Sequence, residues 1–166
     1  MSSNRPYPPP TQILPNLPIR DLLSRKPRGL HCVAPEDTVY RAVSVMAQTE
    51  VGALLVMHED KLVGILSERD YARQIILKGR KSQETLVEEI MTRRVITVSP
   101  ERSIQECMEL LTEHQIRHLP VVEDGRVVGV VTIGDVVRAV LEQQNIAIDE
   151  LSRYVSGEPR LNLSPP

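Results

Sequence analysis

Apolar and polar positions along the second half of the chain predict a short strand followed by a helix. Residues 95–98 form a β-rich run, VITV, that Pro100 closes, which is typical of a short strand. Ser103 and Glu106 then have the spacing of a capping box, so a helix should begin after Ser103. The apolar residues beyond it recur at i, i+3, i+4 and i+7 and predict one buried helical face: Ile104, Cys107, Met108 and Leu111.

A hairpin and a second helix are predicted next. The apolar runs LPVV at 119–122 and RVVGVV at 126–131 flank Asp124-Gly125, a dipeptide that favours a tight β-turn. A helix is expected after the second run, over about 134–144. The elements therefore follow the order strand, helix, strand, strand, helix.

The same order occurs 65 residues earlier, because the chain contains an internal repeat. Residues 33–73 align with 98–138 without a gap, and nearly every apolar position matches an apolar one. Thr38 stands where Ser103 starts the later helix, and a closing helix is expected over about 69–79. We therefore predict an α/β (α+β) fold of two β-α-β-β-α repeats. A pseudo-twofold axis should relate them, with each small sheet flanked by helices.

The repeats and their flanks divide the chain into five segments. DLLSR at 21–25 resembles EIMTR at 89–93, so a related segment precedes each repeat. Six prolines among the first 20 residues argue against the amphipathic helix of a transit peptide. The predicted segments are a disordered leader, the first repeat, the second repeat, a C-terminal helical extension and a disordered tail: 1–18, 19–82, 83–145, 146–157 and 158–166.

Composition argues against several classes of partner. Twenty Lys and Arg against 22 Asp and Glu give a net charge of −2, without the basic excess typical of nucleic-acid or anionic-membrane binding. Four Tyr with no Phe and no Trp provide almost no stacking platform for single-stranded nucleic acid. No apolar stretch is long enough to span a bilayer. The two cysteines fit no local pairing motif, which suits a reducing cytoplasm.

Each hairpin ends in a hydroxyl residue followed three positions later by an aspartate. GVVTIGD at 129–135 contains Thr132 and Asp135, and GILSERD at 64–70 has the same layout. Such a pair can cap the following helix, although Asp is short for the reciprocal bond of a capping box. It can equally hold a ligand, because a helix N-terminus attracts anions and a carboxylate accepts both hydroxyls of a ribose. Gly134 would allow the backbone to approach that ligand closely.

The doubled G-[IV]-[LV]-[ST]-x-x-D motif, the β-α-β-β-α pattern and the HLPV stretch closely resemble a tandem CBS-domain (Bateman) module of the small stand-alone type. The resemblance covers roughly residues 19–150. It implies reversible binding of an adenine nucleotide (AMP, ADP, ATP or NAD(H)) in the cleft between the repeats. It also implies a homodimer formed through apolar helical faces and a conformational signal to an unknown effector protein.

The resemblance also implies a set of nucleotide-binding residues. Asp135 and Asp70 would bind the ribose hydroxyls, beside Thr132 and Ser67. Adenine would lie near 96–98 and 116–120 in the second site, and near 31–33 and 51–54 in the first. The full set of expected nucleotide contacts is Thr132, Asp135, Gly134, Ile133, Arg117, His118, Pro120, Thr97, Val98, Ser67, Asp70 and Arg69.

The two clefts are not expected to be equivalent. Arg117 and His118 in the second repeat replace Gly52 and Ala53 in the first, which adds positive donors to the second site. We therefore expect the Thr132/Asp135 cleft to bind more tightly. Arg69 either reaches a phosphate held by the opposite repeat or is a solvated arginine at a helix start.

Catalysis and metal binding have little support. His114 and His118 have a metal-ligand spacing, but the helix should end near Gln115 and no third ligand lies close in sequence. No nucleophile elbow, P-loop or C-x-x-C motif occurs. The sequence predicts a cytoplasmic nucleotide sensor with no enzymatic activity and no catalytic cofactor. The alternative is a structural homodimerisation module whose ligand sites are vestigial.

Overall fold

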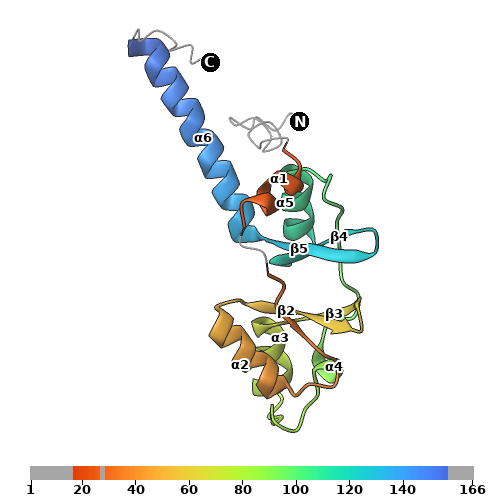
Figure 1. Ribbon diagram of the computed structural model, residues 1–166. Helices are drawn as coiled ribbons and strands as arrows, with labels where there is room; N and C mark the ends of the chain where they lie inside the picture. The colour runs from red at the N-terminus through yellow and green to blue at the C-terminus, as the bar shows by residue number, and fades with distance from the viewer. Residues whose placement is uncertain (1–16, 27–28, 157–166) are drawn as a thin grey trace, which may run out of the picture.

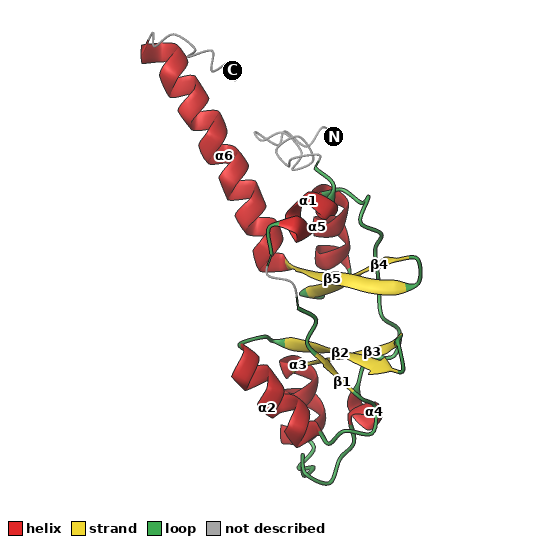
Figure 2. Ribbon diagram, viewed as in Figure 1, coloured by secondary structure: helices red, strands yellow, loops and turns green. Residues whose placement is uncertain are grey.

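Residues 17–26 and 29–156 are described by the computed structural model. Two β-hairpins face one another at the centre, and helices cover their outer sides (Figures 1 and 2). The predicted leader and tail fall almost entirely on residues 1–16 and 157–166, outside the described residues.

The first repeat contains a three-stranded sheet. Its hairpin, β2 (Ala53–His58) and β3 (Lys61–Ser67), is antiparallel, and β1 (Cys32–Val33) pairs in parallel with β2. Helix α2 (Val39–Thr49) packs on the sheet, and α3 (Glu68–Tyr71) follows β3 directly.

The second repeat has the same order with one strand fewer. It contains α5 (Ile104–Glu113), β4 (His118–Glu123), β5 (Arg126–Thr132) and α6 (Ile133–Ser156). The strand predicted over 95–98 is reduced to a single parallel bridge between Val98 and Val121.

Proline explains this difference between the sheets. In the first repeat, the backbone N–H of Leu55 donates to the carbonyl of His31 at 3.1 Å. The corresponding residue in the second repeat is Pro120, which has no N–H, so the matching bond to Ile96 cannot form. The expectation of a full strand at 95–98 was therefore wrong.

The local start and turn signals are confirmed. Ser103 and Glu106 form the predicted capping box, and the Thr38 hydroxyl accepts from the backbone N–H of Arg41 at 3.2 Å. The Asp124-Gly125 turn has φ values of 50° and 76°, both in the left-handed region that this tight hairpin turn requires.

The two closing helices differ from expectation. The helix predicted over 69–79 is the short α3 followed by a π-helix, Ala72–Ile76, and Gly79 at φ 61° lies in the turn beyond it. The helix predicted over 134–144 is instead α6, which runs unbroken through 133–156 and includes the segment expected to form a separate extension.

The short helices before each repeat pack on the opposite repeat. Ile19 of α1 (Ile19–Ser24) is fully buried in the core of the second repeat. Val87 and Ile90 of α4 (Val87–Ile90) are buried in the core of the first. Two glycines permit the crossings: a Cβ at Gly129 would lie 2.6 Å from Leu23, and one at Gly64 would lie 2.5 Å from Met91. The two halves of the chain are thus interlaced, because the segment that precedes each repeat packs on the other repeat.

Across 17–26 and 29–156, every helix is too short or too polar to cross a lipid bilayer.

Candidate functional site

A cavity of about 730 Å³ lies between the two repeats. The start of β2 forms one wall, and β5 together with α1 and the chain beyond it forms another. The apolar lining includes Leu23, Leu30, Val51, Leu54, Ile65 and Val128. The polar lining includes Arg20, Ser24, Lys26, His31, His118 and Thr132. The cavity therefore combines a largely aliphatic interior with a few polar groups, as small-molecule sites generally do.

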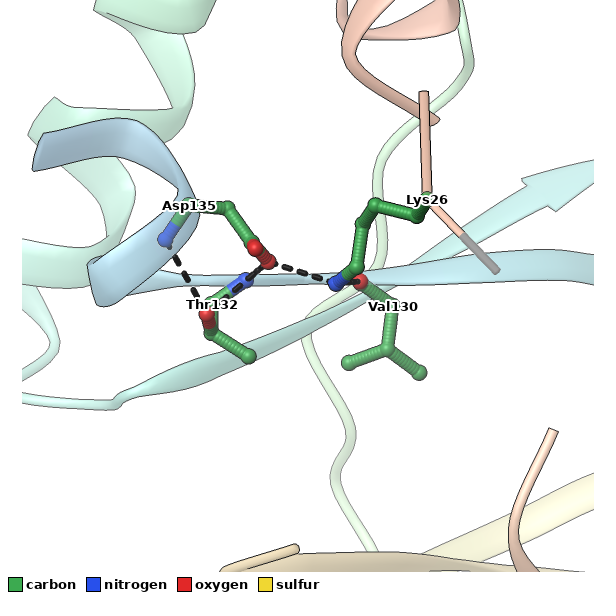
Figure 3. A network of polar contacts seen from close by, with 4 residues as sticks. All are labelled: Lys26, Val130, Thr132 and Asp135. Carbon is green, nitrogen blue, oxygen red and sulfur yellow. Dashed lines mark hydrogen bonds and ion pairs between the residues drawn. The ribbon is translucent and has the colours of Figure 1, made fainter. Parts of the chain in front are cut away.

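Thr132 and Asp135 form a compact polar network where β5 becomes α6 (Figure 3). One carboxylate oxygen of Asp135, Oδ2, accepts from the backbone N–H and the hydroxyl of Thr132, both at 2.8 Å. The Thr132 hydroxyl in turn accepts from the backbone N–H of Asp135 at 3.2 Å. The pair is a reciprocal cap, so Asp is long enough for that bond and the expectation that it would be too short was wrong.

Lys26 completes this network from the segment after α1. Its Nζ donates to Asp135 Oδ2 at 2.6 Å and to the carbonyl of Val130 at 2.9 Å (Figure 3). The Asp135 side chain is only 12% exposed. Burial opposes its charge, but the bonds from Lys26 and Thr132 outweigh burial and hold the pKa of the Asp135 carboxyl below its usual value. Asp135 is therefore ionised at neutral pH.

Lys26 is the functional candidate that sequence reasoning missed. It lines the large cavity and also a second one of about 210 Å³ between α1 and α6. Asp135 lines this second cavity. A signal for it exists: one position beyond the matched stretches 21–25 and 89–93, the chain has Lys26 and Arg94, both cationic. Its pairing with the second repeat could not be read from that match, because it depends on the interlaced path of the chain.

The first repeat contains the same cap, and within 17–26 and 29–156 no lysine donates to it. Asp70 Oδ2 accepts from the backbone N–H of Ser67 at 2.9 Å and from its hydroxyl at 2.7 Å. Arg69 does reach the opposite repeat, where it donates to the carbonyl of Gln115 at 3.0 Å. None of these three residues lines either cavity. The two repeats therefore differ in these polar contacts, and tighter binding in the Thr132/Asp135 cleft stays a prediction.

His118 lies at the meeting point of the repeats. It is the cross-strand partner of Thr132 in the hairpin of β4 and β5. A Cβ at Gly52 would lie 3.2 Å from Glu68 Oε2 and 3.6 Å from His118 Cε1, so side chains of both repeats converge over this glycine. Burial lowers the pKa of the His118 imidazole, and the nearby Glu68 carboxylate partly offsets that effect.

We expect the Glu68→Gln variant to lower the pKa of His118 further, because it removes the anion that favours the imidazolium. Titration of the His118 ring signals by NMR measures this directly. Glu59→Gln, in the exposed turn at the far end of the β2–β3 hairpin, is the matched control and should leave the titration unchanged. An unshifted His118 titration in Glu68→Gln would contradict the contact.

A stability effect accompanies this shift. The unfolded chain takes up a proton on His118 near its ordinary pKa of about 6.5, whereas the folded chain does so only at lower pH. The free energy of unfolding is therefore unaffected by His118 above a pH of about 6.5. It decreases as the pH falls below that value towards the lower pKa of the folded chain.

The structure brings together only some of the predicted contacts. Thr132 and His118 line the large cavity, next to His31 and the 51–54 stretch that were expected at the first site. Val98 and Pro120 are buried instead, Val98 within the core of the second repeat. Thr97, Arg117 and Gly134 are exposed and Ile133 packs against that core; none of these four lines either cavity. The described residues contain no group of three or more His, Cys, Asp or Glu placed to bind a metal.

Comparisons with known proteins agree with this architecture. The CBS domain family matches residues 8–77 and 87–142. The Arabidopsis thaliana mitochondrial CBS domain-containing protein CBSX3 is 46% identical over 127 residues, which cover 74% of this chain and 62% of that protein. This chain thus matches less than two thirds of that relative.

Two solved structures share the fold. The crystal structure of the CBS domain protein NE2398 is 42% identical, with a TM-score of 0.73 over 75% of this chain and 98% of that one. The CBS domain pair of MJ0100, solved with 5′-methylthioadenosine and S-adenosyl-L-methionine, is 28% identical, with a TM-score of 0.68 over 78% of this chain and 99% of that one. The predicted fold is confirmed, and the chain belongs to the CBS-domain family as a pair of CBS repeats, a regulatory module.

Proposed function

We propose that the chain is a sensor that reversibly binds an adenine nucleotide, AMP, ADP, ATP or NAD(H), in the cavity between its repeats. The observation that carries the proposal is the half-buried Thr132–Asp135 pair at the strand-to-helix junction. Thr132 lines that cavity, Asp135 lines the smaller one, and Lys26, which pairs with Asp135, lines both. Among the described residues, Asp135 Oδ2 accepts three hydrogen bonds and Oδ1 accepts none. Oδ1 therefore remains available to accept from a ribose hydroxyl.

The chemistry of the lining supports an adenosine group. A carboxylate that stays ionised is a strong acceptor for a ribose diol, and the Asp135 pKa is lowered. Lys26 places a positive charge next to the expected ribose position, where it can also attract a phosphate. Aliphatic side chains such as Val51 and Leu54 can pack on the purine faces. Both compounds bound to the CBS domain pair of MJ0100 contain an adenosine group.

Signalling would follow from the position of the cavity between the repeats. A ligand that contacts both halves favours one relative orientation of them, and contacts such as Arg69 to the Gln115 carbonyl would respond. An effector protein would then read the altered surface of a homodimer. The cytoplasmic location stays a prediction, and the Arabidopsis relative is named as mitochondrial.

One observation favours a second candidate, a structural homodimerisation module without a ligand. Asp135 Oδ2 already accepts from Thr132 and Lys26, so the motif is sufficient as a helix cap even with an empty cavity.

Calorimetry separates the two candidates. AMP, ATP and NADH are titrated into the wild-type chain and into Asp135→Ala. Heat with the wild type that disappears in the variant supports the sensor, whereas no heat with any of the three compounds supports the structural module. Turnover of the nucleotide during a long incubation would instead indicate an enzyme, and we expect none.

Thr132→Val tests the hydroxyl. We expect it to weaken nucleotide binding by about 1–3 kcal/mol through the loss of one buried hydrogen bond. Because the same hydroxyl caps α6, the variant should also lower the free energy of unfolding by about 0.5–2 kcal/mol. Thr132→Ser keeps the hydroxyl and should retain both properties. Unchanged affinity in Thr132→Val, measured by calorimetry, would contradict the placement of the ligand.

A further inference from the structure

His118 places a titratable group in the wall of the large cavity, beside a candidate ligand contact. It is the first residue of β4, and its cross-strand partner in β5 is Thr132, which lines the same cavity. The side chains of cross-strand partners lie on the same face of a hairpin, with Cβ atoms about 4.5–5.5 Å apart. A ligand that contacts the Thr132 hydroxyl would therefore lie next to the His118 imidazole.

The imidazole lies against the first repeat but keeps its ring nitrogens available. A Cβ at Gly52 would lie 3.6 Å from His118 Cε1 and 3.7 Å from Nε2, so this edge of the ring faces the first repeat. In the described residues, neither ring nitrogen takes part in a hydrogen bond or ion pair, and neither is fully buried. A neutral imidazole has one N–H and one lone pair, so His118 can still accept a proton.

Burial is the largest influence on the imidazole and lowers the pKa of His118. Four charged groups act on it as well. Glu68 of the first repeat and Asp135 at the start of α6 favour the imidazolium, whereas Lys26 and the adjacent Arg117 oppose it. Because two charges of each sign oppose one another, His118 is neutral at neutral pH, and one further charge nearby would decide its state.

A phosphate group on the ligand would supply that charge. A phosphate monoester has a charge of about −1.5 to −2 at pH 7. A charge of opposite sign within about 4–6 Å favours the charged form of a group and typically moves its pKa by about 1–3. The imidazolium in turn donates from both ring nitrogens, whereas the neutral ring donates from one. Protonation would thus provide the ligand with a positive charge and a second donor.

The charges at the other end of the cavity disfavour a phosphate there. Glu123 is the last residue of β4, about 16 Å along the strand from His118, and it also lines the cavity. Arg20 is bound there to two carboxylates, those of Glu101 and Glu123. The three side chains together have a net negative charge, which would repel a phosphate.

Lys26 instead offers a donor at the His118 end. Its ammonium has three N–H groups, two of which donate, to Asp135 and to the carbonyl of Val130. Among the described residues the third has no acceptor, and Lys26 lines the cavity. A phosphate is therefore expected at the end of the cavity where His118 lies.

We propose that the large cavity takes up a proton together with a phosphate-bearing ligand, and that His118 holds this proton. The inference rests on the proposed function, because it concerns the ligand of the same cavity. The proton comes from the solvent and binds the ring nitrogen that has the lone pair. The coupling is reciprocal: the ligand favours the imidazolium by the same factor by which the imidazolium favours the ligand. The chain would therefore bind such a ligand more tightly as the pH falls.

NMR titration of the histidine ring signals tests this in the wild-type chain. Saturating AMP should raise the pKa of His118 by about 1 or more, whereas adenosine, which has no phosphate, should leave it unchanged. The other three histidines are followed in the same spectra: His31, which also lines the cavity, and His58 and His114, which do not. An unchanged His118 pKa with AMP bound, or a rise at His31 in place of His118, would overturn the proposal.

Calorimetry measures the proton directly. AMP binding near pH 6.5, in two buffers that differ in ionisation enthalpy, should show proton uptake by the wild type. The second pKa of a phosphate lies near 6, so His118→Gln is needed to separate the histidine from the ligand, and it should take up less. His114→Gln, at an exposed position outside both cavities, is the matched control and should match the wild type.

The outcomes separate this inference from the proposed function. AMP binding with equal proton uptake in the wild type and in His118→Gln would overturn the inference alone. No binding heat with AMP at any pH would overturn the proposed function, and this inference with it.

Discussion

Ile19→Ala is expected to destabilise the second repeat, although residue 19 precedes the first repeat in the sequence. Ile19 is fully buried among side chains of the second repeat, and truncating a buried isoleucine to alanine typically costs about 2–5 kcal/mol. Native-state hydrogen exchange locates the loss, because it reports protection at each amide. We expect faster exchange in β4 and β5 first, with a matching decrease in the global free energy of unfolding.

Ile90→Ala is the reciprocal control. Ile90 precedes the second repeat but is buried in the core of the first, so its truncation should reduce protection in β2 and β3. If each substitution instead affected the repeat nearest to it in sequence, the interlaced packing of the two halves would be contradicted.

Asp135→Asn is expected to weaken nucleotide binding by about 1.5–3 kcal/mol, or roughly 10- to 150-fold. The amide is nearly isosteric and its oxygen can still accept from the backbone of Thr132, so the cap of α6 is largely kept. It has no negative charge for the ribose hydroxyls, and Lys26 loses its anionic partner. Calorimetry measures the affinity, and the thermal midpoint shows whether the fold is retained.

Asp70→Asn is the matched control in the other repeat. Asp70 makes the same cap, but among the described residues no lysine or arginine pairs with it, and it lines neither of the two cavities. We therefore expect the smaller loss of affinity in this variant. Equal losses in both variants would show that the two clefts contribute alike, and a larger loss in Asp70→Asn would reverse the assignment.

Local features of the chain were predictable because their physical causes are local. A hydroxyl residue three positions before Glu106 fixes a helix start, and Asp124-Gly125 fixes a tight turn. The Thr132–Asp135 pair was found because its motif occurs twice at a constant offset. The helix starts, the tight turn and the Thr132–Asp135 pair of the site follow from such patterns.

The remaining features depend on contacts between distant residues. Pairing of Lys26 with Asp135 joins positions 109 residues apart, and it arises only once α1 packs on the second repeat. The effect of Pro120 on 95–98 depends on a bond to a neighbouring strand. The sequence also could not predict which of the expected contacts line the cavity. The apolar stretch 51–54 and Thr132 come from different repeats and meet only in the folded chain.

The unbroken course of α6 joins two places that would otherwise be mechanically separate. Its first turn contains Asp135, and its last residue lies about 32 Å away from Asp135 along the helix axis. A rigid rod of that length works as a lever: a tilt of about 5° at the base displaces the tip by about 3 Å. A small adjustment beside the cavity is thereby amplified at the far end.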